Sequence, residues 1–216
     1  ALILISVYLI GIFVAILSAL LLKRTVFQGE SVPFVLELPA YRIPSAKSVL
    51  LHMWEKAKDF LRKAFTIIFV ASIIIWFLQS FDFAFNFVED SSTSMLANIG
   101  TWISHIFAPL GFEDWRASTA LVTGITAKES VVSTLSVLTN TTSDAGLSVA
   151  LQTIFSPVSA FAFLCFTVLY MPCVAAFAAT KRELGSMKQA LATVAYQTGV
   201  AYVVALLVYQ IGSLLF

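Results

Sequence analysis

The chain has 216 residues, of which 59% are hydrophobic and only 12% are charged, and its mean hydropathy is +0.92. An ordinary globular domain is about 25% charged, so this composition excludes a cytosolic enzyme or a secreted domain as the default. The net charge of +1 argues against a nucleic-acid binder. We therefore predict an integral membrane protein, whose 19 Phe and four Trp suit lipid-facing and interfacial positions.

Apolar stretches, taken in chain order, predict an all-α, polytopic bundle of membrane helices. A membrane-spanning helix needs about 20 mostly apolar residues. Four stretches meet that requirement: 1–22, 64–80, 157–180 and 189–216. A fifth stretch, 117–138, is long enough but carries Lys128 and Glu129 at its centre. The sequence thus predicts four ordinary spans and one unusual segment.

Two amphipathic stretches lie beside these spans. Apolar residues recur at i, i+3, i+4 spacing across 45–65 and across 94–108, which is typical of a helix with one apolar face. Pro44 and Ser45 mark the start of the first stretch, and Pro109 ends the second. We interpret both as interfacial helices, the first of them cytoplasmic and continuing into the span at 64–80.

The charges between the spans predict the orientation of the chain. Eight basic and four acidic residues lie in 23–63, and three basic and one acidic residue lie in 181–188, whereas 81–116 carries five acidic residues and one basic residue. The positive-inside rule places the first two segments in the cytoplasm and 81–116 outside. A simple span at 117–138 would put 181–188 outside. We therefore expect 117–138 to be a broken or re-entrant element.

The strongest local motif lies in the middle of the span at 157–180. Pro172 has no N–H, so the carbonyl of Val168 loses its helical partner and the helix should kink. A freed carbonyl beside the Cys173 thiol is a plausible ligand set for a metal such as iron or zinc, and Met171 could add a thioether. The alternative is that Cys173 and Met171 simply pack, as we expect for Cys165.

Lys128 and Glu129 are candidates because an ionised group at mid-membrane costs about 2.5–3.5 kcal/mol. Adjacent helix positions point about 100° apart, so each side chain needs its own partner or a water-filled vestibule. Glu129 could be a metal ligand or a proton carrier, and Lys128 should neutralise a carboxylate or bind backbone carbonyls. Thr123 and Gly124 stand where the break would fall. If this segment is not at membrane depth, both charges are simply solvated.

Four motifs, in this order and spacing, resemble the bacterial ferrous-iron transporter B family, FeoB. They are Glu37–Pro44 (ELPAYRIP), Thr123–Ser130 (TGITAKES), Tyr170–Ala175 (YMPCVA) and Tyr196–Gly199 (YQTG). The resemblance covers nearly the whole chain. It implies the end of a first "Gate" region at 1–24, a cytoplasmic linker and interfacial helix at 25–63, and a second Gate region at 64–216.

The resemblance further implies a multi-pass protein of the bacterial inner membrane that imports Fe²⁺. In such a protein Cys173, Glu129 and Met171 would contact the ion, while Pro172, Val168, Gly124 and Lys128 would shape or gate its path. GTP and Mg²⁺ would bind an N-terminal G domain outside this chain, and no Walker A motif or other enzyme motif occurs here. The lipid bilayer, the G domain, the first Gate region, small accessory cytoplasmic proteins and a homo-oligomer are the partners this implies, without nucleic acid.

Two other functions are compatible with the same residues. Gate regions resemble those of nucleoside-transporter-like proteins, in which polar hairpins bind an organic solute. Polar side chains would then bind the solute and Cys173 would pack; these are Thr123, Thr126, Lys128, Glu129 and Gln197. The third reading is a structural membrane module that assembles with a partner subunit and has no path of its own.

Overall fold

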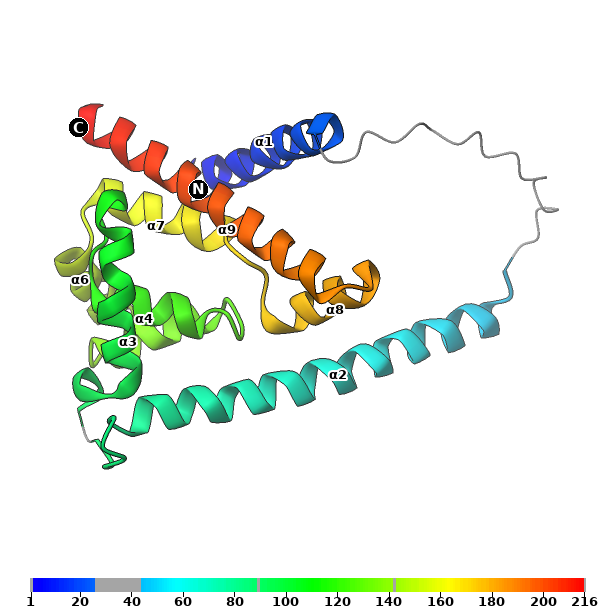
Figure 1. Ribbon diagram of the computed structural model, residues 1–216, viewed down its shortest axis with the longest axis horizontal. Coiled ribbons are helices and arrows are strands. Elements are labelled where there is room, and N and C mark those ends of the chain that lie inside the picture. The colour runs from blue at the N-terminus through cyan, green and yellow to red at the C-terminus, as the bar shows by residue number, and fades with distance from the viewer. Residues whose placement is uncertain (1, 26–43, 89, 142, 216) are drawn as a thin grey trace. The chain divides into compact units, whose positions relative to one another are not determined.

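The computed structural model describes residues 2–25, 44–88, 90–141 and 143–215 (Figure 1). The linker at 26–43, which holds most of the motif at 37–44, lies outside the described residues. Secondary structure within the described part is helical, apart from one isolated antiparallel bridge between Phe81 and Phe87. The chain divides into two units, Ala1–Lys63 and Ala64–Phe216.

The first unit contains α1 (Leu2–Thr25) and the beginning of α2 (Ala46–Ser80). The 24 residues of α1 include no buried side chain, and the helix ends on Lys23 and Arg24. Ser45 accepts a hydrogen bond from the N–H of Ser48 at 3.3 Å, so it caps α2 as the sequence predicts. The 35 residues of α2 are continuous, which confirms that the amphipathic stretch runs into the apolar one.

The second unit continues after α2 with a series of shorter helices and one long helix. They are α3 (Met95–Ser104), α4 (Trp115–Thr123), α5 (Ser130–Leu138), α6 (Asp144–Ile154), α7 (Pro157–Leu169), α8 (Val174–Leu184) and α9 (Met187–Leu215). Among the described helices, α1 and α9 are long and apolar enough to cross a membrane. The pair α6 and α7, bent by 105°, would make a third span or a re-entrant loop.

Three sequence predictions differ from these bounds or are refined by them. The stretch 117–138 is broken between α4 and α5, as expected, but 157–180 is not one kinked helix, because α7 ends at Leu169 and α8 begins at Val174. The stretch 94–108 is helical, but α3 ends at Ser104 and a 3₁₀ helix with Pro109 inside it follows as far as Leu110. Helix α6 was not predicted at all.

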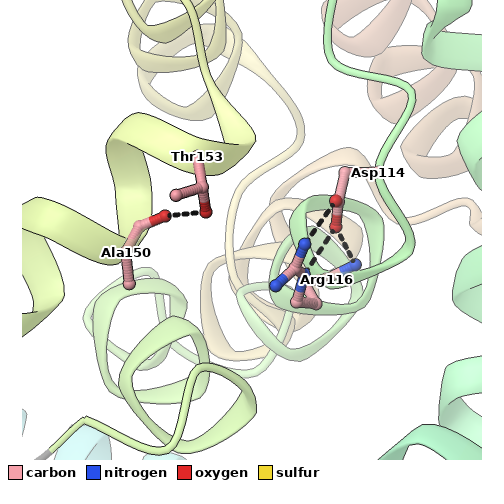
Figure 2. A network of polar contacts seen from close by, with 4 residues as sticks. All are labelled: Asp114, Arg116, Ala150 and Thr153. Atoms are coloured by element: carbon pink, nitrogen blue, oxygen red, sulfur yellow. Dashed lines mark hydrogen bonds and ion pairs between the residues drawn. The ribbon is translucent and has the colours of Figure 1, made fainter.

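Short polar residues set the starts of the helices in the second unit. The carboxylate of Asp114 accepts the N–H of Arg116 at 2.7 Å and also holds the Arg116 guanidinium, at 3.0 and 3.1 Å, at the start of α4 (Figure 2). Ser143 caps α6 and Ser156 caps α7 in the same way. Each cap satisfies N–H groups that the first turn of a helix leaves free.

An aromatic cluster forms the centre of the second unit. The ring of Phe112 lies 5.2 Å from that of Phe107 and 5.4 Å from that of Phe163, and the ring of Phe166 lies 5.5 Å from that of Tyr170. Helix α9 closes this core with small residues, Ala201 and Ala205, which are fully buried. Small residues let membrane helices approach closely, and α9 packs against both α7 and α8.

The loop after α2 is folded around a carboxylate. Asp82 accepts hydrogen bonds from the N–H groups of Ala84 and Asn86 at 2.9 and 2.8 Å. The Asn86 N–H is the main reason why the pKa of the Asp82 carboxyl lies below its ordinary value. The charged carboxylate therefore stabilises this turn.

Candidate functional site at two chain breaks

The first break, between α4 and α5, turns the chain back on itself. The hydroxyls of Thr123 and Thr134 are hydrogen bonded at 2.8 Å, although 11 residues of straight helix would separate them by about 16 Å. The Ser130 hydroxyl also donates to the carbonyl of Thr123 at 3.0 Å. The two nine-residue helices thus form a hairpin, the geometry that a re-entrant element requires.

Gly124 stands at this break because the surrounding groups leave no room for a side chain. Its backbone is right-handed helical, so conformation does not demand glycine. A Cβ placed there would lie 2.5 Å from the Val131 side chain and 2.6 Å from the Tyr170 hydroxyl. Gly124 therefore allows the first break to lie against the second.

The second break separates α7 from α8. Tyr170 and Cys173 both have extended backbones, and Pro172 between them cannot donate to the carbonyl of Val168. Because the residue before a proline also avoids helical conformation, the chain stays extended through Met171 and does not merely kink. Cys173 becomes the N-cap residue of α8, and its half-buried thiol makes no capping hydrogen bond.

The Lys128 ammonium fills the position that Pro172 leaves open. It donates to the carbonyl of Val168 at 2.9 Å and to that of Tyr170 at 3.4 Å, and it lies 4.9 Å from the centre of the Tyr170 ring. The expectation that Lys128 binds backbone carbonyls is therefore confirmed. The Val168 carbonyl, considered above as a metal ligand, is bonded to an ammonium.

Two further hydrogen bonds join the breaks. The N–H of Val174 donates to the carbonyl of Ile125 at 2.9 Å, and the Tyr170 hydroxyl donates to the carbonyl of Leu121 at 3.3 Å. Since Val174 directly follows Cys173, the first bond fixes the thiol beside the first break. The structure thus brings Cys173, Lys128 and Gly124 to one junction, which we call the break junction (residues 123–130 and 168–174).

Glu129 and Met171 occupy different surroundings at the break junction. Glu129 precedes α5 and is exposed, whereas Met171 is half-buried and packs against the aromatic core. Within the described part of the chain, no three His, Cys, Asp or Glu side chains gather closely enough to hold a metal ion. An ion at Cys173 would therefore need backbone carbonyls, water or Met171 as further ligands.

A cleft of about 630 Å³ lies beside the break junction, between α5, α6 and α7. Its wall is mainly apolar, with Leu135, Leu151 and Phe163 among its members, and Lys128 also lines it. Sequence reasoning missed this cleft because it missed α6. The signal was present: Ser143 is a capping residue, and Leu147, Leu151 and Ile154 follow at helical spacing.

Several polar groups expected to bind an organic solute are instead engaged inside the protein. The hydroxyl of Thr123 bonds to Ala120 and Thr134, and that of Thr126 donates to the carbonyl of Thr123 at 2.8 Å. Of that expected set only Lys128 lines the cleft. The cleft therefore offers a polar organic solute only one group of that set.

Comparison with known families matches both parts of the chain. A family model described as "Ferrous iron transport protein B C terminus" matches residues 4–56, and one named Gate, described as "Nucleoside recognition", matches residues 61–187. No solved structure matches.

Similar curated proteins are named as iron transporters. "Fe(2+) transporter FeoB" of Staphylococcus aureus strain COL is 39% identical over 99% of this chain and 32% of its own length. The Methanocaldococcus jannaschii protein of that name is 40% identical over 99% of this chain and 33% of its own. A Porphyromonas gingivalis "Fe(2+) transport protein A/Fe(2+) transporter FeoB fusion protein" is 35% identical over the full chain and 31% of its own length. This chain spans about a third of these relatives, and it belongs to the FeoB family.

Proposed function

We propose that this chain is part of an importer of ferrous iron in a bacterial inner membrane, and that Fe²⁺ passes the break junction. Relatives named as Fe(2+) transporters support Fe²⁺ as the transported ion. The observation that carries the proposal is the position of Cys173, whose half-buried thiol lies where two interrupted helices are hydrogen bonded together. Irregular backbone at membrane depth is tolerated only where protein or a water-filled path surrounds it.

The residues of the break junction would act in sequence on the ion. Exposed Glu129 attracts the hydrated cation. At the break Fe²⁺ exchanges some of its water for the Cys173 sulfur, a ligand that favours iron over Mg²⁺ or Ca²⁺. Met171 is the second soft donor within this segment, and Pro172 keeps the segment extended. Conduction needs each of these contacts to be weak enough for the ion to leave.

Energy and control would come from outside this chain. We place a GTP- and Mg²⁺-binding G domain on the cytoplasmic side, so its motion would reach the membrane through the amphipathic first half of α2. That stretch exposes Leu50, Met53 and Trp54, as an interfacial helix would. Fusion of the relative from Porphyromonas gingivalis to a "Fe(2+) transport protein A" supports a small accessory protein as a partner.

The test compares the two cysteines in the full-length protein. Cys173→Ser should lower anaerobic ⁵⁵Fe²⁺ uptake by about tenfold or more, because it replaces a soft sulfur ligand by a hydroxyl. Cys165→Ala is the matched control, since Cys165 is fully buried eight residues earlier in α7. Equal uptake by Cys173→Ser and the wild-type protein, at equal abundance in the membrane, would remove Cys173 from the path.

A further inference from the structure

The C-terminal end of α7 presents two backbone carbonyls that have lost their helical partners. The carbonyl of Val168 faces Pro172, which has no N–H. The carbonyl of Tyr170 would normally accept from Val174, but the Val174 N–H donates to Ile125 instead. Carbonyls at a helix C-terminus carry partial negative charge, so these two oxygens form one end of a cation site.

The ring of Tyr170 completes this site. Its face lies 4.9 Å from the Lys128 nitrogen, within the range over which an aromatic ring attracts an ammonium. Two carbonyl oxygens and one ring face therefore surround a single positive charge, and all of them come from the end of α7. The positive charge belongs to Lys128, which lies in the other break, 40 residues before Val168 in the chain.

We propose that Lys128 is a tethered resident cation: it occupies an oxygen-lined cation site at the end of α7, positions Cys173 by holding the two breaks together, and keeps small hard cations out of that site. Carbonyl oxygens suit hard cations, whereas a thiol suits softer ones. With the oxygens occupied by Lys128, the Cys173 sulfur is the ligand left for a passing ion. The relevance to iron rests on the function proposed above, but the cation site itself does not.

Chemical rescue tests the proposal on the purified full-length protein. In Lys128→Ala the cation site is empty and the breaks separate more often, so N-ethylmaleimide should alkylate Cys173 about tenfold faster, a factor typical of losing a charge-assisted hydrogen bond. Ethylammonium at tens of millimolar should restore the slow rate, because the cleft beside Lys128 gives it access. Tetramethylammonium, which has no N–H, should not. Alkylation is read as the mass of the peptide that contains Cys173.

Matched variants control for general loosening of the fold. Lys128→Arg keeps a charged donor and should alkylate near the wild-type rate, whereas Lys128→Met keeps the length without the charge and should be fast and insensitive to ethylammonium. Lys188→Ala removes an exposed lysine and should change nothing. If Lys128→Ala does not fold, the difference between Lys128→Arg and Lys128→Met decides the matter.

Three results would overturn the proposal: a wild-type alkylation rate in Lys128→Ala, equal rates in Lys128→Arg and Lys128→Met, or equal rescue by both ammonium ions. None of these measurements uses iron. Failure of iron uptake would therefore count against the proposed function alone, and failure of rescue against the resident cation alone.

Discussion

At the scale of single residues, two cysteines eight residues apart show how strongly the surroundings of a thiol determine its reactivity. Cys165 lies within α7 and is fully buried, and burial raises the energy of a thiolate. Cys173 lies in the extended break, half-buried and without a capping bond. Both residues are cysteines, but their surroundings differ because Pro172 ends the helix before Cys173.

Gly124 gives a prediction at the same scale. Gly124→Ala should destabilise the full-length protein by about 1–3 kcal/mol, as overpacking typically does, because its Cβ would meet Val131 and Tyr170. Gly199→Ala is the matched control: apart from its own helix backbone and its chain neighbours, no described atom lies within 4 Å of a Cβ at this position, so helix propensity makes the change neutral or favourable. Thermal unfolding in detergent measures both, and equal melting temperatures would show that the breaks do not lie this close.

At the scale of elements, local sequence signals predicted the positions of helix ends better than they predicted the contacts that those ends make. Gly124 marked the first break, Pro172 predicted a kink where the structure has the second break, and Lys128 was expected to neutralise a carboxylate or bind backbone carbonyls. The partner carbonyl at Val168 lies 40 residues away, and no local pattern encodes a contact at that distance. Helix α6 was missed for a different reason: with 11 residues it is shorter than a membrane span, so a search for spans passes over it although its cap and apolar spacing are those of a helix.

The α4–α5 hairpin gives the prediction for this scale. Because the Thr123 hydroxyl donates to the Ala120 carbonyl, it must accept from Thr134 across the hairpin. Thr123→Val and Thr134→Val should each destabilise the protein, and a double-mutant cycle should give a coupling of about 0.5–1.5 kcal/mol, the usual net value of one hydrogen bond. Thr193→Val is the control, because the Thr193 hydroxyl donates to the carbonyl of Gln189 within the same helix, α9. Strictly additive effects would argue against the hairpin.

At the scale of the whole second unit, the number of membrane crossings before a loop decides which side of the membrane that loop faces. Helices α7 and α8 have 13 and 11 residues, about 36 Å of helix together, and both pack against the 29-residue α9. Helix α7 could pair with α6 or with α8, and we interpret α7, the break and α8 as the interrupted crossing beside α9, with α6 outside the membrane. With the hairpin of α4 and α5 returning to its starting side, the positive loop at 181–188 then stays in the cytoplasm.

This arrangement predicts that α6 faces the outside, which cysteine labelling can test. Ser148→Cys, on the exposed side of α6, should react in intact cells with a membrane-impermeant maleimide, as should Ser92→Cys in the 3₁₀ helix Ser91–Thr93 that precedes α3. Gln189→Cys, at the cytoplasmic start of α9, should react only after the cells are permeabilised. If 117–138 is a re-entrant hairpin, Ser148 and Ser92 lie on the same side of the membrane. If 117–138 crosses the membrane as an ordinary span, Ser148 lies on the side of Gln189. Labelling of Ser148→Cys only after permeabilisation would therefore exclude a re-entrant hairpin, and with it the vestibule that the path through the break junction needs.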